Sequence, residues 1–329
     1  MFEVQDVAEL DRAKACAAAE QFRLEVLTDP DSSAFDRAYR MLDEFFGPRG
    51  ELEERSALAR FAREGMIPYG QRVEGNYRLV AAWDGDVLAG VRDCYIDIDP
   101  KVGVCLTALS HVLIAPAYRR TGLGALFRAF PVTLARQITA DRLGSHHGLP
   151  ILIAAEMEPA DPENPDTLIR LLAYGRSGFR VMDPRRVPYS QPDFRDVVAL
   201  GLEHLALPLL PVLRWVDHPQ ATEIPGWLAA AYPRLFHMAH YTYLPVDRVK
   251  PSEMHALETL ARSPDPVPLL PLPTSFADVR LLEPLLRGAV LPLYPERLRG
   301  PDPTWRPVEM DMAELIARFA TSNADERAL

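Results

Sequence analysis

The residues from 112 to 124, VLIAPAYRRTGLG, join an extended run to a helix, and this junction constrains the fold more than any other stretch. Val112 and Ile114 alternate with Leu113 as in a strand, whereas the apolar residues from Leu126 onward recur at helical spacing. Two glycines one residue apart leave the first-turn amides of that helix uncovered, and those amides have no partners within the helix. The junction therefore predicts an anion site, most naturally for a pyrophosphate. The alternative is a helix start that glycine merely softens and that binds nothing.

Two common phosphate-binding patterns are absent from this junction. A dinucleotide fingerprint G-x-G-x-x-G needs a glycine where Phe127 stands, and the G-K-S or G-K-T of a Walker loop occurs nowhere in the chain. The junction instead resembles motif A of the GNAT superfamily of acyl-CoA N-acyltransferases, which reads hydrophobic-x-hydrophobic-x-Pro-x-x-Arg-x-x-Gly-x-Gly or Ala. The matching positions are Val112, Ile114, Pro116, Arg119, Gly122 and Gly124.

A second stretch, LAYGRSGF at 172–179, is similar to the end of motif B of the same superfamily, hydrophobic-x-Tyr-x-x-x-Gly-Phe. Tyr174, Gly178 and Phe179 occupy the matching positions. Two departures lie on the same predicted helix, because Thr167 stands where the family often has Asn and Arg170 where a small residue is common. A helix and a strand are expected between the two motifs, as the family's fold requires.

The resemblance implies an α/β (α+β) fold with a GNAT-like mixed, mostly antiparallel central sheet flanked by helices. The residues predict a hairpin of 77–83 and 86–98 about Asp84-Gly85, followed by a third antiparallel strand at 104–114. The run 150–155 reads as a strand buried on both faces, and 180–183 and 208–216 as the last two strands. Pro131 should kink or break the helix that follows the glycines.

The chain divides into three predicted segments. Residues 1–34 form an N-terminal helical segment, 35–217 the GNAT-like acyltransferase domain, and 218–329 a helical, proline-rich C-terminal extension with a last helix near 310–319. The apolar content of the extension is too high for a free linker. We therefore expect it to pack on the core or on a partner subunit, which leaves a homo-oligomer possible.

Charge and cysteine content exclude several classes of partner. The net charge of −10 argues against nucleic acid or an anionic membrane surface. Cys16, Cys94 and Cys105 lack metal-ligand spacing and fit free thiols in a reducing cytosol. No stretch has the apolar core of a signal peptide or the length of a membrane span. The expectation is a cytoplasmic protein without a metal.

The resemblance implies acetyl-CoA as the co-substrate. Its pyrophosphate would meet the basic turn and the first-turn amides, and its pantetheine arm and thioester carbonyl would meet backbone donors at the end of the preceding strand. The cofactor-binding residues implied in this way are Leu113, Ile114, Arg119, Arg120, Thr121, Gly122, Leu123, Gly124 and Ala125.

Acetyl transfer to an amine needs a base for the ammonium, donors for the oxyanion and an acid for the thiolate. Tyr174 is the expected acid, with simple packing beside Phe179 as the alternative. The family's acidic base would fall near Ala108, so that position is vacant. The candidates to replace it are His111, Glu156 and Glu158. A hydrogen-bonded core residue is the alternative for His111.

Two functions from different classes remain open at this point. The first is an N-acetyltransferase that moves an acetyl group from acetyl-CoA to an amine on a small molecule or a protein. The second is a non-catalytic acyl-CoA-binding or assembly module whose C-terminal extension carries an interaction surface. Tyr174 favours the first, and the vacant base position keeps the second open. The sequence does not name the acceptor, since variable loops and helices form such pockets.

Overall fold

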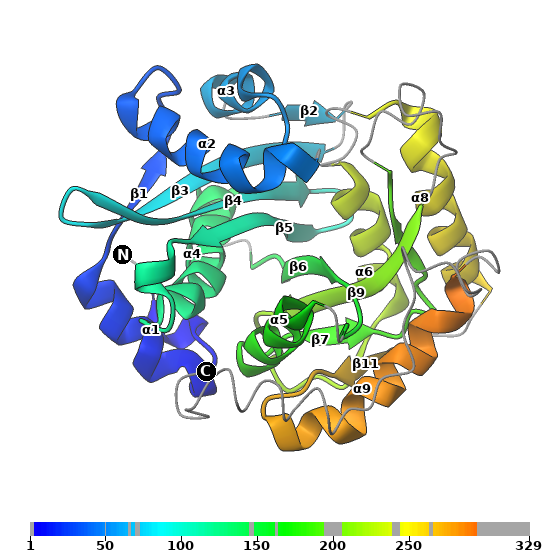
Figure 1. Ribbon diagram of the computed structural model, residues 1–329. Helices are drawn as coiled ribbons and strands as arrows, with labels where there is room; N and C mark the ends of the chain where they lie inside the picture. Colours follow the sequence, from blue (N-terminus) through cyan, green and yellow to red (C-terminus); the bar gives the residue numbers. More distant parts are fainter. Residues whose placement is uncertain are drawn as a thin grey trace.

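The computed structural model describes residues 3–49, 51–64, 67–69, 73–144, 148–161, 164–193, 206–238, 244–262 and 266–294. Across these segments, eleven strands form one sheet, and helices lie on both of its faces (Figure 1). The strand order is β1-β3-β4-β5-β6-β9-β7-β11-β10, with β2 beside β3 and β8 beside β9. Every pair of neighbouring strands is antiparallel except β5 and β6. The predicted fold class, a mixed and mostly antiparallel sheet flanked by helices, is confirmed.

The elements have the following bounds. The strands are β1 Arg23–Leu27, β2 Ile67–Tyr69, β3 Val73–Asp84, β4 Val87–Asp99, β5 Val104–Ile114, β6 Ile151–Met157, β7 Arg180–Met182, β8 Tyr189–Gln191, β9 Leu207–Trp215, β10 Glu223–Ile224 and β11 Val267–Pro271. The α-helices are α1 Glu9–Gln21, α2 Ser33–Phe46, α3 Arg55–Glu64, α4 Leu123–Leu143, α5 Pro165–Arg176, α6 Gly226–Ala229, α8 Val246–Ala261 and α9 Phe276–Val290. Short 3-10 turns are η1 Val4–Asp6, η2 Gly47–Arg49, η3 Pro116–Tyr118 and η5 Leu291–Leu293, and η4 Tyr232–Phe236 is a π-helix.

The predicted meander forms the middle of the sheet. β3 and β4 meet at the Asp84-Gly85 turn, where Gly85 has a φ of 57°, the left-handed conformation that glycine adopts without strain. β5 then pairs antiparallel with β4, as expected. β6 lies on the other side of β5 and runs parallel to it, so the intervening chain must cross over, and α4 makes this crossover.

α4 passes through Pro131 without ending, so the predicted break is wrong. Proline removes one N–H donor and crowds the preceding turn. The helix nevertheless continues because it is buried on both sides of the proline, at Phe127 and Ala129 before it and at Val132 and Leu134 after it. Burial of this apolar surface offsets the local cost.

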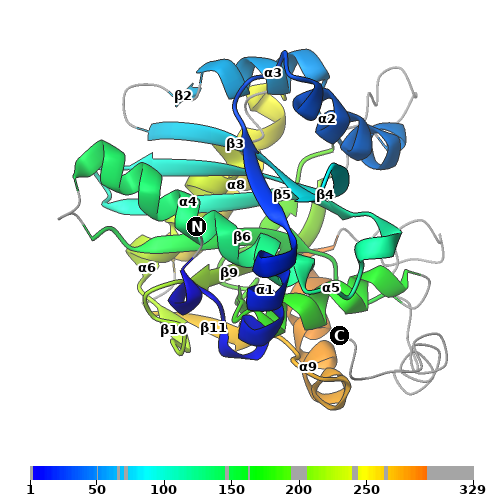
Figure 2. The same cartoon turned by 90° about the vertical axis from the view of Figure 1, so that its left-hand side faces the viewer.

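The helices divide between the two faces of the sheet. α2 and α3 cover β3, β4 and β5 on one face, and α4 covers β4, β5 and β6 on the other, with α1 packed on the outside of α4 (Figures 1 and 2). Side chains along β4 alternate between these faces. The Asp93 carboxylate accepts a hydrogen bond from Tyr77 on the α3 face, whereas Arg92 reaches Tyr174 of α5 on the α4 face.

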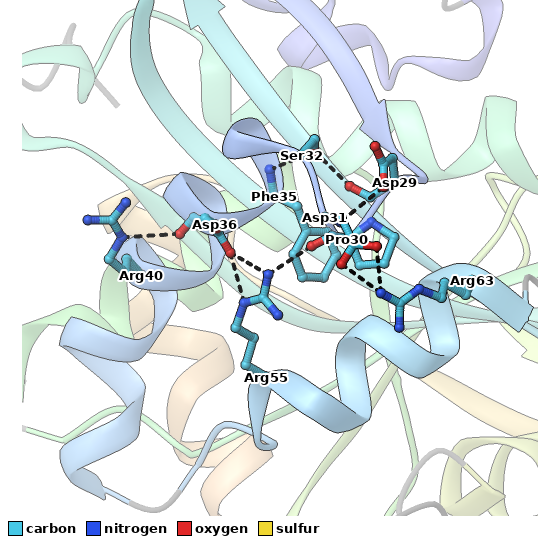
Figure 3. A network of polar contacts seen from close by, with 9 residues as sticks. All are labelled: Asp29, Pro30, Asp31, Ser32, Phe35, Asp36, Arg40, Arg55 and Arg63. Carbon is cyan, nitrogen blue, oxygen red and sulfur yellow. Dashed lines mark hydrogen bonds and ion pairs between the residues drawn. The ribbon is translucent and has the colours of Figure 1, made fainter.

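A network of polar contacts ties α3 to the start of α2 (Figure 3). The Ser32 hydroxyl accepts from the Phe35 amide at 3.2 Å and caps α2. Arg55, the first residue of α3, donates to the Pro30 carbonyl at 2.8 Å and pairs with Asp36, with its Nε 2.8 Å from Oδ1. These contacts fix the two helices relative to each other over the sheet.

The terminal segments extend the same sheet. β1, within the predicted segment 1–34, pairs with β3, and β11, within the predicted extension, pairs with β7. The predicted boundaries at 34 and 217 therefore fall within one continuous sheet, and the strands β10 and β11 of the extension join the core through β7. Neither strand was predicted. The helix expected near 310–319 lies outside the described residues.

Candidate active site

The turn after β5 has the strand, turn and helix order that its sequence predicts. β5 ends at Ile114, η3 follows, and α4 begins at Leu123 with Gly122 as its N-cap. The amide of Leu126 is bonded to the Gly122 carbonyl at 3.1 Å. The preceding first-turn amides have no intrahelical acceptor, and Gly122 has no side chain that could cap them. This helix start therefore offers donors and the positive end of the helix dipole to an anion.

The two glycines of the turn have different roles. Gly122 has a φ of 91°, and a Cβ there would lie 2.3 Å from the carbonyl oxygen of Lys14 in α1. A Cβ at Gly124 would meet only the Arg128 and Ile114 side chains, at 3.4 and 3.5 Å. The fold thus requires glycine at 122, whereas glycine at 124 keeps the helix start open.

The basic residues of the turn lie at its surface. Arg119 and Arg120 are exposed, and the Thr121 hydroxyl donates to the Tyr118 carbonyl at 2.7 Å. Arg120 has a φ of 70°, and it is the one non-glycine residue with a positive φ in the described part of the chain. Such a conformation costs free energy and is more frequent at ligand sites than elsewhere.

β5 and β6 are paired over only part of their lengths. Their parallel ladder runs from Cys105 opposite Ile151 to Ala108 opposite Ala154 and stops there, although β5 continues to Ile114. On its other edge, β5 remains paired with β4 up to Ile114, opposite Gly90. One edge of β5 beyond Ala108 therefore has backbone groups that no strand pairs, and these groups lie just before the basic turn.

A bulge lies where β5 parts from β6. The register between β4 and β5 shifts, so that Asp93 of β4 faces two residues of β5, Ser110 and His111. Bulges of this kind re-aim side chains and are frequent next to active sites. The bulge places His111 on the α2 face, where its ring contacts that of Phe46 with centroids 4.8 Å apart.

His111 is held at both ring nitrogens. Nδ1 lies 3.1 Å from Asp93 Oδ2, and Nε2 lies 2.7 Å from the Glu51 carbonyl oxygen. Burial lowers the pKa of His111, but the charge and hydrogen bond of Asp93, with Glu53 and the Glu51 carbonyl, raise it to about 9 overall. At neutral pH the ring is then a cation that donates from both nitrogens. This arrangement favours a structural role over that of a general base.

Glu156 lies on β6, just past the end of the β5–β6 ladder. Its Oε1 accepts from Gln191 Nε2 at 2.5 Å, and its Oε2 is buried without a hydrogen bond. Burial raises the pKa of Glu156 to about 7, although hydrogen bonds from Tyr189 and Gln191 oppose the rise. A carboxylate that titrates near neutral pH has the properties of a general base. The third candidate, Glu158, is half exposed and pairs with Arg170 at 2.9 Å.

Tyr174 of α5 lies on the opposite face from His111. Its side chain is 8% exposed, and its ring packs edge-on against Phe179 with centroids 4.8 Å apart. Its hydroxyl is 3.5 Å from Nη2 of Arg92, and the guanidinium of Arg128 lies 5.8 Å from the ring centroid. The predicted packing with Phe179 is thus present, and the hydroxyl also has a polar neighbour. Sequence reasoning missed both arginines, although Arg92 stands out as a charge within a buried strand.

A cavity of about 590 Å³ lies between α2 and the end of β5. Apolar side chains of Met41, Phe45, Leu88 and Leu113 line it together with charged ones. The charged lining residues are Arg37, Arg40, Glu44 and Arg119. Arg37 is already engaged, because it donates to the Asp86 carbonyl at 2.9 Å and stacks over Trp83. The cavity thus extends from α2 to the basic turn after β5.

Within the described ranges, no group of three or more His, Cys, Asp and Glu side chains could hold a metal ion. Cys16, Cys94 and Cys105 are free thiols, and burial raises the pKa of both Cys94 and Cys105 to about 12. None of the described helices is long and apolar enough to cross a membrane.

No family model matches the chain, and no curated protein matches it. Solved structures resemble part of it. A putative acetyltransferase of the GNAT family from Desulfovibrio desulfuricans has 18% identity and a TM-score of 0.35, over 59% of this chain and 99% of that one. An acetyltransferase from Bacillus subtilis in complex with CoA has 16% identity and a TM-score of 0.30, over 58% of this chain and 97% of that one.

An N-acyl amino acid synthase from uncultured soil microbes has 13% identity and a TM-score of 0.34, over 60% of this chain and 92% of that one. With TM-scores this low, the likenesses carry no conclusion about the activity of this chain.

Proposed function

We propose that this protein is an N-acetyltransferase that moves an acetyl group from acetyl-CoA to an amine by direct attack of the amine on the thioester. The observation that carries the proposal is the end of the β5–β6 ladder at Ala108 and Ala154. Beyond this point one edge of β5 has backbone groups that no strand pairs. The open start of α4 follows the end of this edge, and Tyr174 of α5 lies on the face of the sheet that α4 covers.

Acetyl-CoA would bind along the unpaired edge of β5. The backbone groups of Ile114, which point away from β4, would bond the pantetheine arm as strand groups bond a neighbouring strand, with Leu113 beside it. The pyrophosphate would lie at the first-turn amides from Gly122 to Ala125, with Arg119 and Arg120 as counter-charges and the Thr121 hydroxyl nearby. Acetyl-CoA is a co-substrate here, and it supplies the thioester.

Glu156 is the proposed general base. Its carboxyl titrates close to neutral pH, and one of its oxygens has no hydrogen bond to give up. The incoming ammonium would pass one proton to this carboxylate, directly or through a water, and become the neutral nucleophile. His111 would not be the base. Its role would be to hold the bulge of β5 in place through its ion pair with Asp93.

Tyr174 is the proposed general acid. As the amine nitrogen bonds to the thioester carbonyl carbon, the carbonyl electrons move to oxygen, where backbone donors of β5 can stabilise them. The carbon–sulfur bond then breaks with its electron pair on sulfur, and the Tyr174 hydroxyl gives its proton to that sulfur. The nitrogen, which carries a positive charge after the attack, loses its second proton to solvent, and the Tyr174 phenolate regains a proton from solvent. The products are the acetylated amine and coenzyme A as a thiol.

The cavity under α2 is the proposed acceptor site. It adjoins Leu113 and Arg119, and its lining combines apolar side chains with charges of both signs. An amine with an apolar body would fit this lining, whether it is a small molecule or a protein side chain. The Glu44 carboxylate in this lining would favour an ammonium group.

Cofactor binding can be tested at Gly124, since Gly122 is needed for folding. Gly124→Glu places a negative charge and a bulky group at the helix start, whereas Gly124→Ala adds one methyl group at ordinary contact distances. We expect calorimetric titration with acetyl-CoA to give at least a tenfold loss of affinity for the Glu variant and little change for Ala. Equal affinity in all three proteins would refute the proposed cofactor site.

Activity is tested with the wild-type protein, acetyl-CoA and a panel of amines, by following thiol release. Amine-dependent release is the expected result. Tight binding of acetyl-CoA with no release over the whole panel would favour the non-catalytic module instead.

A further inference from the structure

Arg92 is a buried charge in the middle of β4. It is 1% exposed, and it is the largest of the fully buried residues that the structure describes. The alternation of β4 turns it to the face that α4 and α5 cover, opposite to the Asp93 and His111 pair. A guanidinium is always charged and loses its hydration in such a place, so it needs a compensating partner.

The partners of Arg92 are few. Its Nη2 lies 3.5 Å from the Tyr174 hydroxyl, and its Nε is buried without a hydrogen bond. Among the described residues, no carboxylate forms an ion pair with it, whereas Arg128 and Arg287, which are also largely buried, pair with Asp11 and Glu283. A well-packed protein pairs its buried charges. Arg92 therefore lacks a negative partner in the resting protein.

A negative charge does arise next to Arg92 if Tyr174 acts as the acid. We propose that Arg92 is a positioning residue for acyl transfer, which holds the Tyr174 hydroxyl and stabilises the negative charge left on its oxygen when the proton goes to sulfur. This inference rests on the proposed function. The positive charge of Arg92 then gains a negative partner, the Tyr174 oxygen, only when the proton has gone to sulfur. Because Arg92 has no carboxylate partner among the described residues before this step, its charge stabilises the transition state more than the resting protein.

The direction of the contact supports this role. A guanidinium only donates, so the Tyr174 oxygen must accept from Arg92, and the proton of the hydroxyl is left to point elsewhere. In the step itself the carbon–sulfur bond breaks, the Tyr174 O–H bond breaks and an S–H bond forms. The phenolate oxygen then faces Arg92 until it recovers a proton from solvent. Arg128, over the ring of Tyr174, adds a second positive charge but is neutralised by Asp11.

The test compares Arg92→Met, which removes the charge and keeps a long side chain, with Arg92→Lys, which keeps the charge. Each change is also made in Tyr174→Phe. Thiol release is measured with amine and with water alone as acceptor, since departure of the thiolate is common to both reactions. We expect Arg92→Met to lower turnover by roughly ten- to a hundredfold with unchanged affinity for acetyl-CoA. Arg92→Lys should retain most of the turnover.

Two readouts separate this role from a structural one. Arg92→Met should leave the melting temperature unchanged or raise it, because an unpaired buried charge is lost. In the Tyr174→Phe protein it should cause no further loss of turnover, because Arg92 acts through the hydroxyl. An equal loss in both backgrounds would overturn the proposal. So would failure of both Arg92→Met and Arg92→Gln to fold, which would make Arg92 a structural residue.

The outcome for Arg92 is distinct from that for the activity. If the wild-type protein releases no thiol with any amine or with water, the proposed function fails and this inference fails with it. If the wild-type protein releases thiol and Arg92→Met does so at the same rate, only the role of Arg92 is refuted.

Discussion

The imidazole of His111, 11% exposed, pairs with the buried carboxylate of Asp93, with Nδ1 and Oδ2 3.1 Å apart. The other carboxylate oxygen accepts from the His111 amide at 2.6 Å. At the bulge, the His111 amide has no partner in the β4–β5 ladder. The Asp93 side chain accepts its hydrogen bond instead and also holds the His111 ring. The pair fixes β5 just beyond the end of its ladder with β6 at Ala108, and His111 itself lies two residues before Leu113.

The first prediction concerns the pH dependence of stability. The folded-state pKa of His111 is raised from 6.5 to about 9, so the protonated ring stabilises the fold fully below pH 6.5, and this stability is lost as the pH rises through 9. Asp93→Asn removes the charge that contributes most to the rise. Between pH 6 and about 9.5 the wild-type protein should lose on the order of 3 kcal/mol more free energy of unfolding than the variant.

Urea denaturation of both proteins at several pH values measures this difference, and other titrating groups largely cancel in the comparison. Parallel loss of stability in the two proteins would mean that the Asp93 pair does not hold the proton on His111.

The second prediction concerns Glu156. A base must be unprotonated, and burial raises the pKa of this carboxyl to about 7, so kcat/KM should rise as the pH passes through about 7. Glu156→Gln should lower turnover by roughly a hundred- to a thousandfold and abolish this acidic limb. Glu158→Gln, at a half-exposed ion pair, is the matched control and should change turnover by less than about twofold. An intact acidic limb in Glu156→Gln would assign the base elsewhere.

The third prediction concerns the two glycines of the basic turn. Gly122→Ala forces a side chain into a φ of 91° and against the Lys14 carbonyl, so it should lower the free energy of unfolding by about 2 kcal/mol or more. Gly124→Ala lies in a helix with room for a methyl group and should be neutral or slightly stabilising. Denaturant unfolding compares the two variants. Equal stability would show that α1 does not pack against Gly122 as described.

The fourth prediction concerns the contact of α1 with α4 and α5. Asp11 is buried, pairs with Arg128 at 3.0 Å and accepts a hydrogen bond from the Ser177 hydroxyl. Asp11→Asn leaves the Arg128 charge without its partner and should cost about 3 kcal/mol of stability. Glu9→Gln, at an exposed position in the first turn of the same helix, should cost less than about 0.5 kcal/mol. A similar cost for both would show that Asp11 is not the link between these helices.

Much of the fold could be predicted because its signals are local. The hairpin at Asp84-Gly85 needed only a turn that glycine permits and two alternating runs, and both lie within a few residues of each other. The order of strand, basic turn and helix around Gly122 rested on a change from strand to helix periodicity. The resemblance to two motifs then led to the expectation of a mixed, mostly antiparallel sheet flanked by helices, which the described residues form.

Other elements gave no sufficient local signal. β1, RLEVL, is short and half exposed, and it is a strand because the edge of β3 is there to pair with. β11 contains two prolines, which argue against a strand in isolation. It pairs with β7 and β10 all the same, because the Pro268 carbonyl still accepts a hydrogen bond and the Leu269 amide still donates one. Pro131 failed to end α4 because packing on both sides of it outweighs the local cost.

The sequence by itself determined the order of strand, basic turn and helix start, and it singled out Tyr174 as a candidate acid, since residue types at fixed spacing carry that information. Only the tertiary structure decided that Gly122 is needed against Lys14, that His111 is held by Asp93, and that Arg92 lies beneath the Tyr174 hydroxyl. Arg92 and Tyr174 are 82 positions apart. The charge of a buried group depends on neighbours that the fold brings from such distances, and no local pattern of residues encodes them.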